Sequence, residues 1–197
     1  MAAPLLIVGL GNPGPKFFHT RHNVGFDLIE ALSVSLNCTL KRPFLRPVEW
    51  YNPRRAPFGV GLAAPLTFMN RSGLVIPWLL RKSGVSLERM VVAVDNMDLP
   101  PGEVRMKRRG KTAGHNGLKS VSAAVGSDEY PRVYIGVGRP AAGNDTVEHV
   151  LGAFGADHRA LVDAAIERIA PALAQGAEYE DIQQLISRVN ALRHRDG

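Results

Sequence analysis

The chain has 197 residues, of which 45% are hydrophobic and 21% charged. This profile is typical of one globular domain that buries a core without disulfides or metal. Its single cysteine, Cys38, excludes an internal disulfide, and no apolar run in the sequence is long enough to cross a bilayer. The formal net charge of +6 is compatible with a polyanionic partner but does not require one. We expect a cytoplasmic protein without a membrane segment.

The predicted elements alternate between strands and helices. In chain order we expect a strand at 5–8, a helix at 25–36, an irregular or edge-strand segment at 40–57, a strand at 60–64, a helix from about 72 with a proline at 77 that kinks it or marks its first turn, strands at 90–94 and 103–108, a helix at 118–125, a strand at 133–137, and amphipathic helices at 161–173 and 179–192. This alternation predicts an α/β fold in one domain, residues 1–197, with a mainly parallel or mixed central sheet.

Four polar side chains stand where these strands end and loops begin. They are Asn12, Asn70, Asp95 and Asn116. Working groups of α/β proteins gather at the ends of strands, so these four residues give the first indication of a site.

The loop after the first strand, Gly9 to Gly14, matches the pattern G-x-G-x-x-G. Alone, this pattern suggests a dinucleotide-binding turn. However, the next helix is delayed to about Gly25, and the acidic residue at the expected spacing, Glu30, falls within that helix. A nucleotide-cofactor enzyme is therefore a minor alternative, which an NAD titration would test.

The same stretch belongs to a longer pattern that covers the whole chain. GLGNPGPKFFHTRHNVGF (9–26) is followed in order by TFMNxSG (67–73), Asp95 with DLPPG (98–102), GHNGL (114–118), IGVGRP (135–140) and VLG (150–152). This series closely resembles the bacterial-type peptidyl-tRNA hydrolases. The resemblance implies a monomeric α/β domain with a twisted, mixed sheet, no cofactor, and peptidyl-tRNA as substrate.

The resemblance also assigns roles to individual residues. His22 resembles the catalytic base of the family, and Asp95 resembles the carboxylate that orients it. The polar and apolar groups around the substrate are expected to be Asn12, Phe17, Phe68, Met69, Asn70, His115 and Asn116, and Lys107 resembles a contact to a tRNA phosphate.

Three positions depart from the family pattern. The family usually has tyrosine where this chain has Phe17, and the glycine-rich loop before His-Asn is replaced by the cationic segment 109–114. Tyr134 stands where several members have a basic residue. Our hypothesis is that the charge for gripping tRNA has moved to the 105–111 segment; unchanged affinity and salt dependence after neutral substitutions at Arg108, Arg109 and Lys111 would disprove it.

The residue types suit ester hydrolysis without a metal. A neutral histidine accepts a proton from water near pH 7, and a carboxylate on its other nitrogen fixes the tautomer. Asn70 and Asn116 are candidate donors to the developing oxyanion, and Asn12 is a candidate for positioning the peptide or the water. His19 and His22 have a metal-like spacing, but no third ligand or HExxH motif is evident.

Plainer interpretations remain for each residue. Asn12 could be only a turn former, Asn116 only a helix cap, and Phe68 and Met69 only core. Asp98 competes locally with Asp95 for the role of the orienting carboxylate.

An RNA partner fits the basic cluster, where Lys107, Arg108, Arg109 and Lys111 are the expected phosphate contacts. The second hypothesis is a catalytically silent relative that binds RNA as an accessory protein, as some plastid members of this family do.

Overall fold

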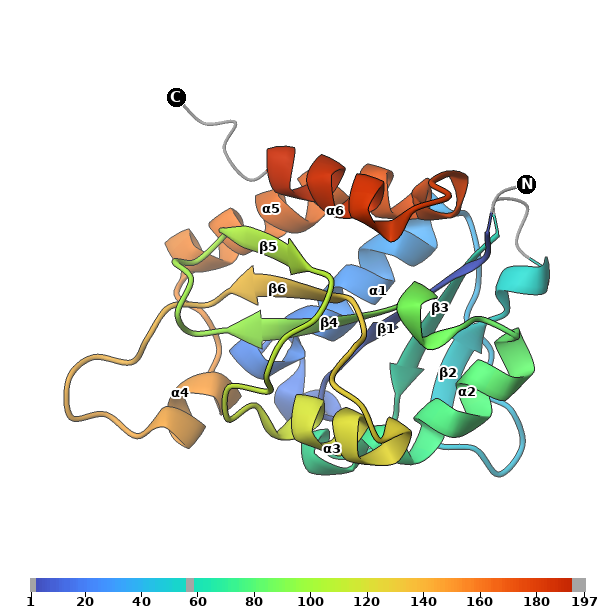
Figure 1. Cartoon of the computed structure of the whole chain (residues 1–197). Helices are drawn as coiled ribbons and strands as arrows, with labels where there is room; N and C mark the ends of the chain where they lie inside the picture. Colours follow the sequence, from blue (N-terminus) through green and yellow to red (C-terminus); the bar gives the residue numbers. More distant parts are fainter. Residues whose placement is uncertain (1–2, 56–58, 193–197) are drawn as a thin grey trace.

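The computed structural model describes residues 3–55 and 59–192. These residues form a six-stranded sheet with the order β2-β3-β1-β4-β6-β5 (Figure 1). Its strands are β1 (Leu5–Gly9), β2 (Val48–Tyr51), β3 (Val60–Pro65), β4 (Met90–Asn96), β5 (Val104–Lys107) and β6 (Arg132–Gly136). The four central strands are parallel, and the edge strands β2 and β5 are antiparallel to their neighbours. The predicted α/β domain with a mixed sheet is confirmed.

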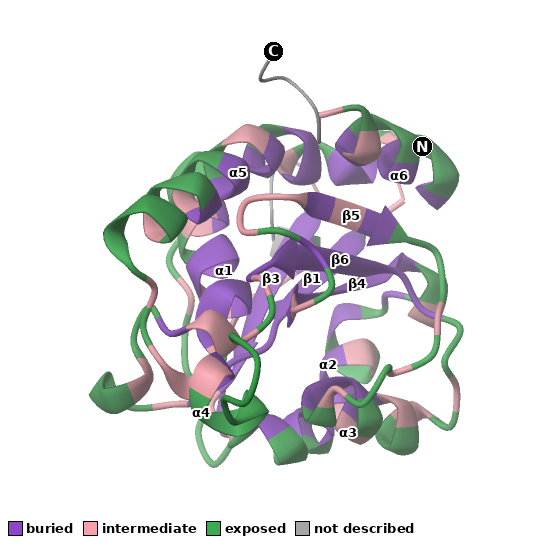
Figure 2. Ribbon diagram, turned by 90° about the vertical axis from the view of Figure 1, so that its left-hand side faces the viewer, coloured by how far each residue is buried: buried purple, intermediate pink, exposed green. Residues whose placement is uncertain are grey.

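Helices cover both faces of this sheet (Figures 1 and 2). One face carries α1 (Val24–Ser35), α5 (Ala156–Ala174) and α6 (Ile182–Ala191), and the other carries α2 (Ile76–Ser83) and α3 (Asn116–Val125). Alternate residues of β1 therefore enter different core layers: Ile7 packs toward α1, whereas Val8 packs in the layer with α2 and α3. This double burial explains why the central strands are continuous apolar runs.

Two glycines bring α1 unusually close to the strands. A Cβ on Gly25 would lie 2.4 Å from the carbonyl oxygen of Leu10, and a Cβ on Gly9 would lie 2.1 Å from that of Gly25. Any side chain at either position would push α1 away from the sheet. The residues just before α1 thus lie against the carboxyl ends of β1 and β4.

Some boundaries differ from expectation because local chemistry overrides the pattern. The helix expected from about Ser72 is a 3₁₀ helix, η4 (Met69–Val75), followed by α2, with Pro77 in the first turn of α2. Proline is suited to a first turn because its missing N–H has no partner there. The 40–57 segment contains the edge strand β2, while residues 56 and 57 lie outside the described part of the chain.

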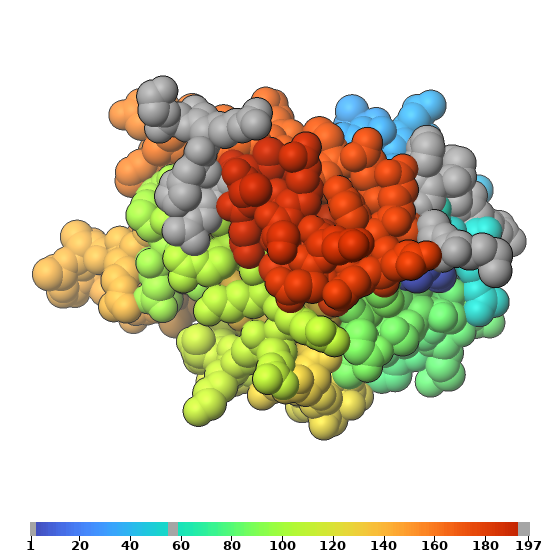
Figure 3. All heavy atoms as spheres, turned by 45° about the horizontal axis from the view of Figure 1, so that its top comes forward, coloured from blue at the N-terminus to red at the C-terminus, as the bar shows by residue number. Residues whose placement is uncertain are grey.

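A short helix, α4 (Thr146–Leu151), was not expected. Asp145 caps it by accepting a hydrogen bond from the Glu148 N–H at 2.8 Å. The segment between β6 and α4 projects from the body of the protein (gold in Figures 1 and 3). Across both described stretches, no helix combines the length and the hydropathy needed to cross a bilayer.

Candidate active site

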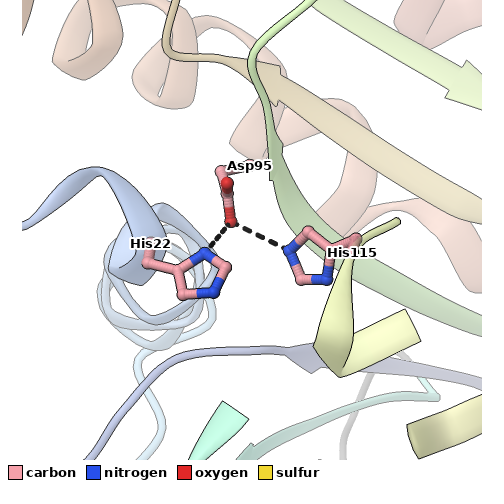
Figure 4. Close-up of side chains that lie close together, drawn as sticks. All are labelled: His22, Asp95 and His115. Atoms are coloured by element: carbon pink, nitrogen blue, oxygen red, sulfur yellow. Dashed lines mark hydrogen bonds and ion pairs between the residues drawn. The ribbon is translucent and has the colours of Figure 1, made fainter. Parts of the chain in front are cut away.

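His22 and Asp95 meet although 73 positions separate them in the sequence. His22 lies in the 3₁₀ helix η2 (Arg21–Asn23), directly before α1, and Asp95 lies near the end of β4. Nδ1 of His22 is 2.7 Å from Oδ1 of Asp95, and the second ring nitrogen points away from the carboxylate (Figure 4). An ionised carboxylate only accepts hydrogen bonds, so His22 donates from Nδ1 and keeps the lone pair of Nε2 free.

His115 binds the same carboxylate oxygen. Its Nε2 is 3.0 Å from Oδ1 of Asp95 (Figure 4). Its Nδ1 accepts hydrogen bonds from the N–H groups of Gly117 and Leu118, so that His115, and not Asn116, is the N-cap of α3. Nδ1 must therefore be unprotonated, which places the proton on Nε2, where it is donated to Asp95.

The two imidazoles keep Asp95 ionised inside the protein. Burial raises the pKa of Asp95, because a charge loses hydration there. The electrostatic attraction of His115 and the hydrogen bonds from His115 and His22 outweigh burial, so the pKa lies well below its usual range. Asp95 is therefore a charged acceptor that holds both rings in fixed tautomers.

His22, Asp95 and His115 are also a set of residue types that bind metals, with ligand atoms within 4.8 Å of one another. A metal-bound histidine normally donates its other N–H to a neighbour. His115 cannot do so, because its Nδ1 already accepts two backbone N–H groups. A metal on Nε2 would leave the ring without any proton, so this donor set fits a hydrogen-bonded arrangement and not a metal site. The other histidine considered for a metal pair, His19, binds Asp27 instead.

Asn12 is fixed by two neighbours. Oδ1 of Asn12 accepts the Met69 N–H at 2.8 Å, and the backbone N–H and C=O of Asn12 bind the side-chain amide of Asn23 at 2.8 and 3.0 Å. Within the described residues Nδ2 of Asn12 has no hydrogen-bond partner and keeps its donors. Asn23 was not among the predicted site residues, although it lies within the histidine motif. Its burial (2% exposed) and its two hydrogen bonds to the backbone of Asn12 show that it supports the site.

Asn70 and Asn116 occupy neighbouring helix starts. A Cβ on Gly117 would lie 2.5 Å from Sδ of Met69, so the start of η4 packs directly against that of α3. Asn70 and Asn116 follow and precede these two contact residues, and both side chains are exposed. Each is free of hydrogen bonds to other described residues, as a donor to a substrate must be.

The apolar residues expected around the substrate divide into two kinds. Phe68 is 57% exposed, and its ring meets the half-buried ring of Phe17 edge-to-face at a centroid distance of 6.5 Å. Met69 is 4% exposed and belongs to the core layer between the sheet and α3. Its backbone N–H binds Asn12, and its side chain packs in the core.

A pocket of about 700 Å³ opens beside the carboxylate and both imidazoles. The segments that line it are the end of β4, the loop before α3, and the projecting segment with α4. Asn116 and Tyr134 also line it. Asp98, the sequence competitor of Asp95, is an exposed residue that forms a 2.6 Å ion pair with Arg139 at this pocket, an interaction that sequence analysis missed.

The predicted phosphate contacts lie on an exposed loop. Lys107 ends β5, and Arg108, Arg109 and Lys111 follow it; all four are exposed. Arg109 forms a 3.0 Å ion pair with Glu129, whereas Lys107 and Lys111 have no ion pair with any described residue. The hydroxyl of Tyr134 lies 3.4 Å from Nη1 of the buried Arg132, and Tyr134 itself is only 8% exposed.

Comparisons with known proteins agree on one family. A family model described as peptidyl-tRNA hydrolase matches residues 6–196. Peptidyl-tRNA hydrolase of Geobacillus kaustophilus is 38% identical over 178 residues, covering 90% of this chain and 95% of that protein. The Halalkalibacterium halodurans enzyme is 40% identical over 167 residues, covering 85% and 90%. A crystal structure of peptidyl-tRNA hydrolase from Acinetobacter baumannii superposes with a TM-score of 0.84 at 31% identity, covering 97% of this chain and 96% of that one.

Proposed function

The chain belongs to the peptidyl-tRNA hydrolase family, and from this premise we propose that His22 is the general base of its reaction. The protein is a hydrolase that cleaves the ester bond between peptide and tRNA and so releases free tRNA for translation. What the family assignment leaves open is which atoms of this chain carry the chemistry.

The observation that carries the proposal is the 2.7 Å contact between Nδ1 of His22 and Asp95. It leaves Nε2 of His22 unprotonated at the pocket. Nε2 takes a proton from a water molecule as the water oxygen attacks the ester carbonyl carbon, and Asp95 stabilises the resulting imidazolium. The same proton then protonates the leaving 3′ oxygen of tRNA. Neither a metal nor a covalent intermediate takes part.

Amide donors stabilise the charge that develops on the carbonyl oxygen. Asn70 and Asn116 are the oxyanion donors in this proposal, since both side chains are exposed at adjoining helix starts. Each such donor contributes about 10²-fold to 10³-fold in rate. Asn12 positions the peptide or the water through its free Nδ2, and Phe17 and Phe68 provide an apolar wall.

The tRNA part of the substrate is expected to contact the basic loop, which we define as residues 107–114. Lys107, Arg108 and Lys111 are the proposed phosphate contacts, with Arg109 as a weaker one because Glu129 already binds it. An A-form acceptor stem is recognised mainly through phosphates and shape, which suits an enzyme that accepts many tRNAs. We further propose that the protein acts as a monomer in the cytoplasm without a cofactor.

One experiment tests the assignment of His22 directly. Hydrolysis of an N-acetylaminoacyl-tRNA labelled in its acyl group is followed with the wild type and with His22→Ala. The variant should lose about 10²-fold to 10⁴-fold in kcat, and acid quenching during turnover should leave no label on the protein. A loss of only a few-fold removes His22 from the mechanism, and label on the protein indicates a covalent intermediate. An intact chain that binds tRNA without any turnover would support the silent accessory relative.

A further inference from the structure

Arg132 is a fully buried cation beside the site. It is the first residue of β6, and its side chain is 0% exposed. The guanidinium stacks on the ring of Tyr130 at 4.4 Å. Nη2 donates to Asp128, at 3.2 Å to the backbone carbonyl and 3.4 Å to Oδ1. Burying a charged group costs free energy because the group loses its hydration. Partners such as these offset that cost for Arg132.

The other arm of the guanidinium holds the basic loop. Nη1 of Arg132 donates to the carbonyl oxygen of Lys111 at 2.9 Å, and a Cβ on Gly110 would lie 3.5 Å from the same nitrogen. Among the described side-chain contacts, the loop (107–114) is otherwise held by exposed side chains, namely the ion pair of Arg109 with Glu129 and the electrostatic attraction between Arg108 and Glu88. Exposed ion pairs contribute little, so Arg132 is the stronger anchor.

The loop is strained between this anchor and the active site. Ala113 has a φ of +47° and Gly114 a φ of +84°. A residue with a Cβ adopts the left-handed region at a cost of about 1 to 3 kcal/mol, and only where its surroundings enforce it. Of these two residues only Ala113 is strained, because glycine has no Cβ. Directly after them, His115 closes a turn by donating its N–H to the carbonyl of Thr112 at 2.9 Å. The position of Lys111 therefore determines how His115 reaches Asp95.

We propose that Arg132 is a positioning residue for the hydrolysis: it holds the basic loop so that the loop's cations face the tRNA and the residue that follows the loop, His115, meets Asp95. Arg132 has no exposed surface and so does not touch the substrate. This inference rests on the proposed role of His22, because it acts through the carboxylate that orients that ring.

Only a guanidinium makes this connection. Its two terminal nitrogens point to different partners, Lys111 and Asp128, whereas a lysine at 132 would place one ammonium on one of them. The variant Arg132→Lys therefore keeps the positive charge but cannot bind Lys111 and Asp128 at the same time. Arg89→Lys is the matched control, because Arg89 is also buried (9% exposed) and binds the backbone carbonyls of Ala3 and Gly176, away from the pocket.

The test compares two substrates at a temperature well below the melting point of every variant. One is full-length N-acetylaminoacyl-tRNA and the other is the same acyl group on a CCA trinucleotide, which lacks the acceptor stem. Arg132→Lys should lower kcat on both substrates by about 10-fold to 100-fold, since small displacements of positioned groups have effects of this size. It should also raise KM for the full-length substrate alone. Asp128→Ala removes a half-exposed carboxylate partner and leaves the guanidinium in place. It should lower kcat and raise KM as Arg132→Lys does, but by smaller factors.

The outcomes separate the two proposals. An unchanged kcat on the trinucleotide ester in both Arg132→Lys and Asp128→Ala overturns the positioning role, because a merely structural arginine changes only the melting temperature. An equal loss in Arg89→Lys overturns it as well, by tracing the effect to general destabilisation. The proposed role of His22 is tested separately: it fails if His22→Ala, assayed in parallel, loses only a few-fold in kcat.

Discussion

Asp95 accepts the Nδ1–H of His22 at 2.7 Å with a side chain that is only 4% exposed. Because so little water reaches the carboxylate, the hydrogen bonds of the two imidazoles determine its state. This contact alone places the ring proton of His22 on Nδ1, and so leaves Nε2 free to act as the base.

Asp95→Asn should remove the negative charge that stabilises the imidazolium of His22. Because His115 can only donate from Nε2, the introduced amide would place its oxygen between the two rings, so that both histidines keep their tautomers but lose the ionic partner. We expect kcat to fall by up to about 10⁴-fold with little change in KM, as for other histidine–aspartate pairs. Steady-state hydrolysis of N-acetylaminoacyl-tRNA measures both. Asp98→Asn makes the same chemical change three residues further on; a loss of equal size there would contradict the choice of Asp95.

His115 has two functions that one pair of variants separates. His115→Asn keeps an oxygen that caps α3 but lacks the Nε2–H donated to Asp95, whereas His115→Ala loses both. We expect both variants to lower kcat, and only His115→Ala to lose about 1 kcal/mol of unfolding free energy, because asparagine is a good N-cap and alanine is not. Chemical denaturation and kinetics test this together. Wild-type kcat in His115→Asn would show that the hydrogen bond to Asp95 has no role in turnover.

The low pKa of Asp95 has a defined effect on acid stability. A carboxyl group whose pKa is lowered on folding stabilises the folded state above its unfolded pKa, about 3.9. This contribution is lost as the pH falls from there toward the folded pKa. Between pH 5 and pH 3, the free energy of unfolding in urea should therefore fall more for the wild type than for Asp95→Asn. Equal falls in the two proteins would show that the pKa of Asp95 is not lowered by folding.

The fold was largely predictable from the sequence because the strands are continuous apolar runs and the helices are spaced by turn residues. The edge position of β2 and the short α4 were harder to predict, since neither has a long periodic pattern. The pairing of His22 with Asp95 came from the family resemblance. Three contacts could not be predicted, because they depend on side-chain directions that sequence spacing does not encode. They are the helix cap formed by His115, the hydrogen bond of the buried Arg132 to Lys111, and the ion pair of Asp98 with Arg139.

The basic loop should account for part of the salt dependence of tRNA binding. Each cation that contacts a phosphate contributes about one unit to the slope of log K against log salt. Lys107→Gln and Lys111→Gln should each lower the slope by about that amount and leave kcat on a trinucleotide ester unchanged. Lys82→Gln, an exposed cation of α2, should leave the slope unchanged. If the loop variants behave like Lys82→Gln, the phosphates bind elsewhere.

Asn12 offers a way to separate a structural hydrogen bond from a functional one. Its Oδ1 accepts the buried Met69 N–H, so Asn12→Ala should leave that donor unpaired and cost about 1 to 3 kcal/mol of unfolding free energy. Asn12→Asp keeps an acceptor at the same place and should retain most of this stability, but it lacks the free N–H donors of the amide. We therefore expect kcat/KM on N-acetylaminoacyl-tRNA to fall in both variants, and stability to fall chiefly in Asn12→Ala. If Asn12→Asp retains full activity, Asn12 holds Met69 and does nothing more; if it loses activity at nearly wild-type stability, the amide N–H groups face the substrate.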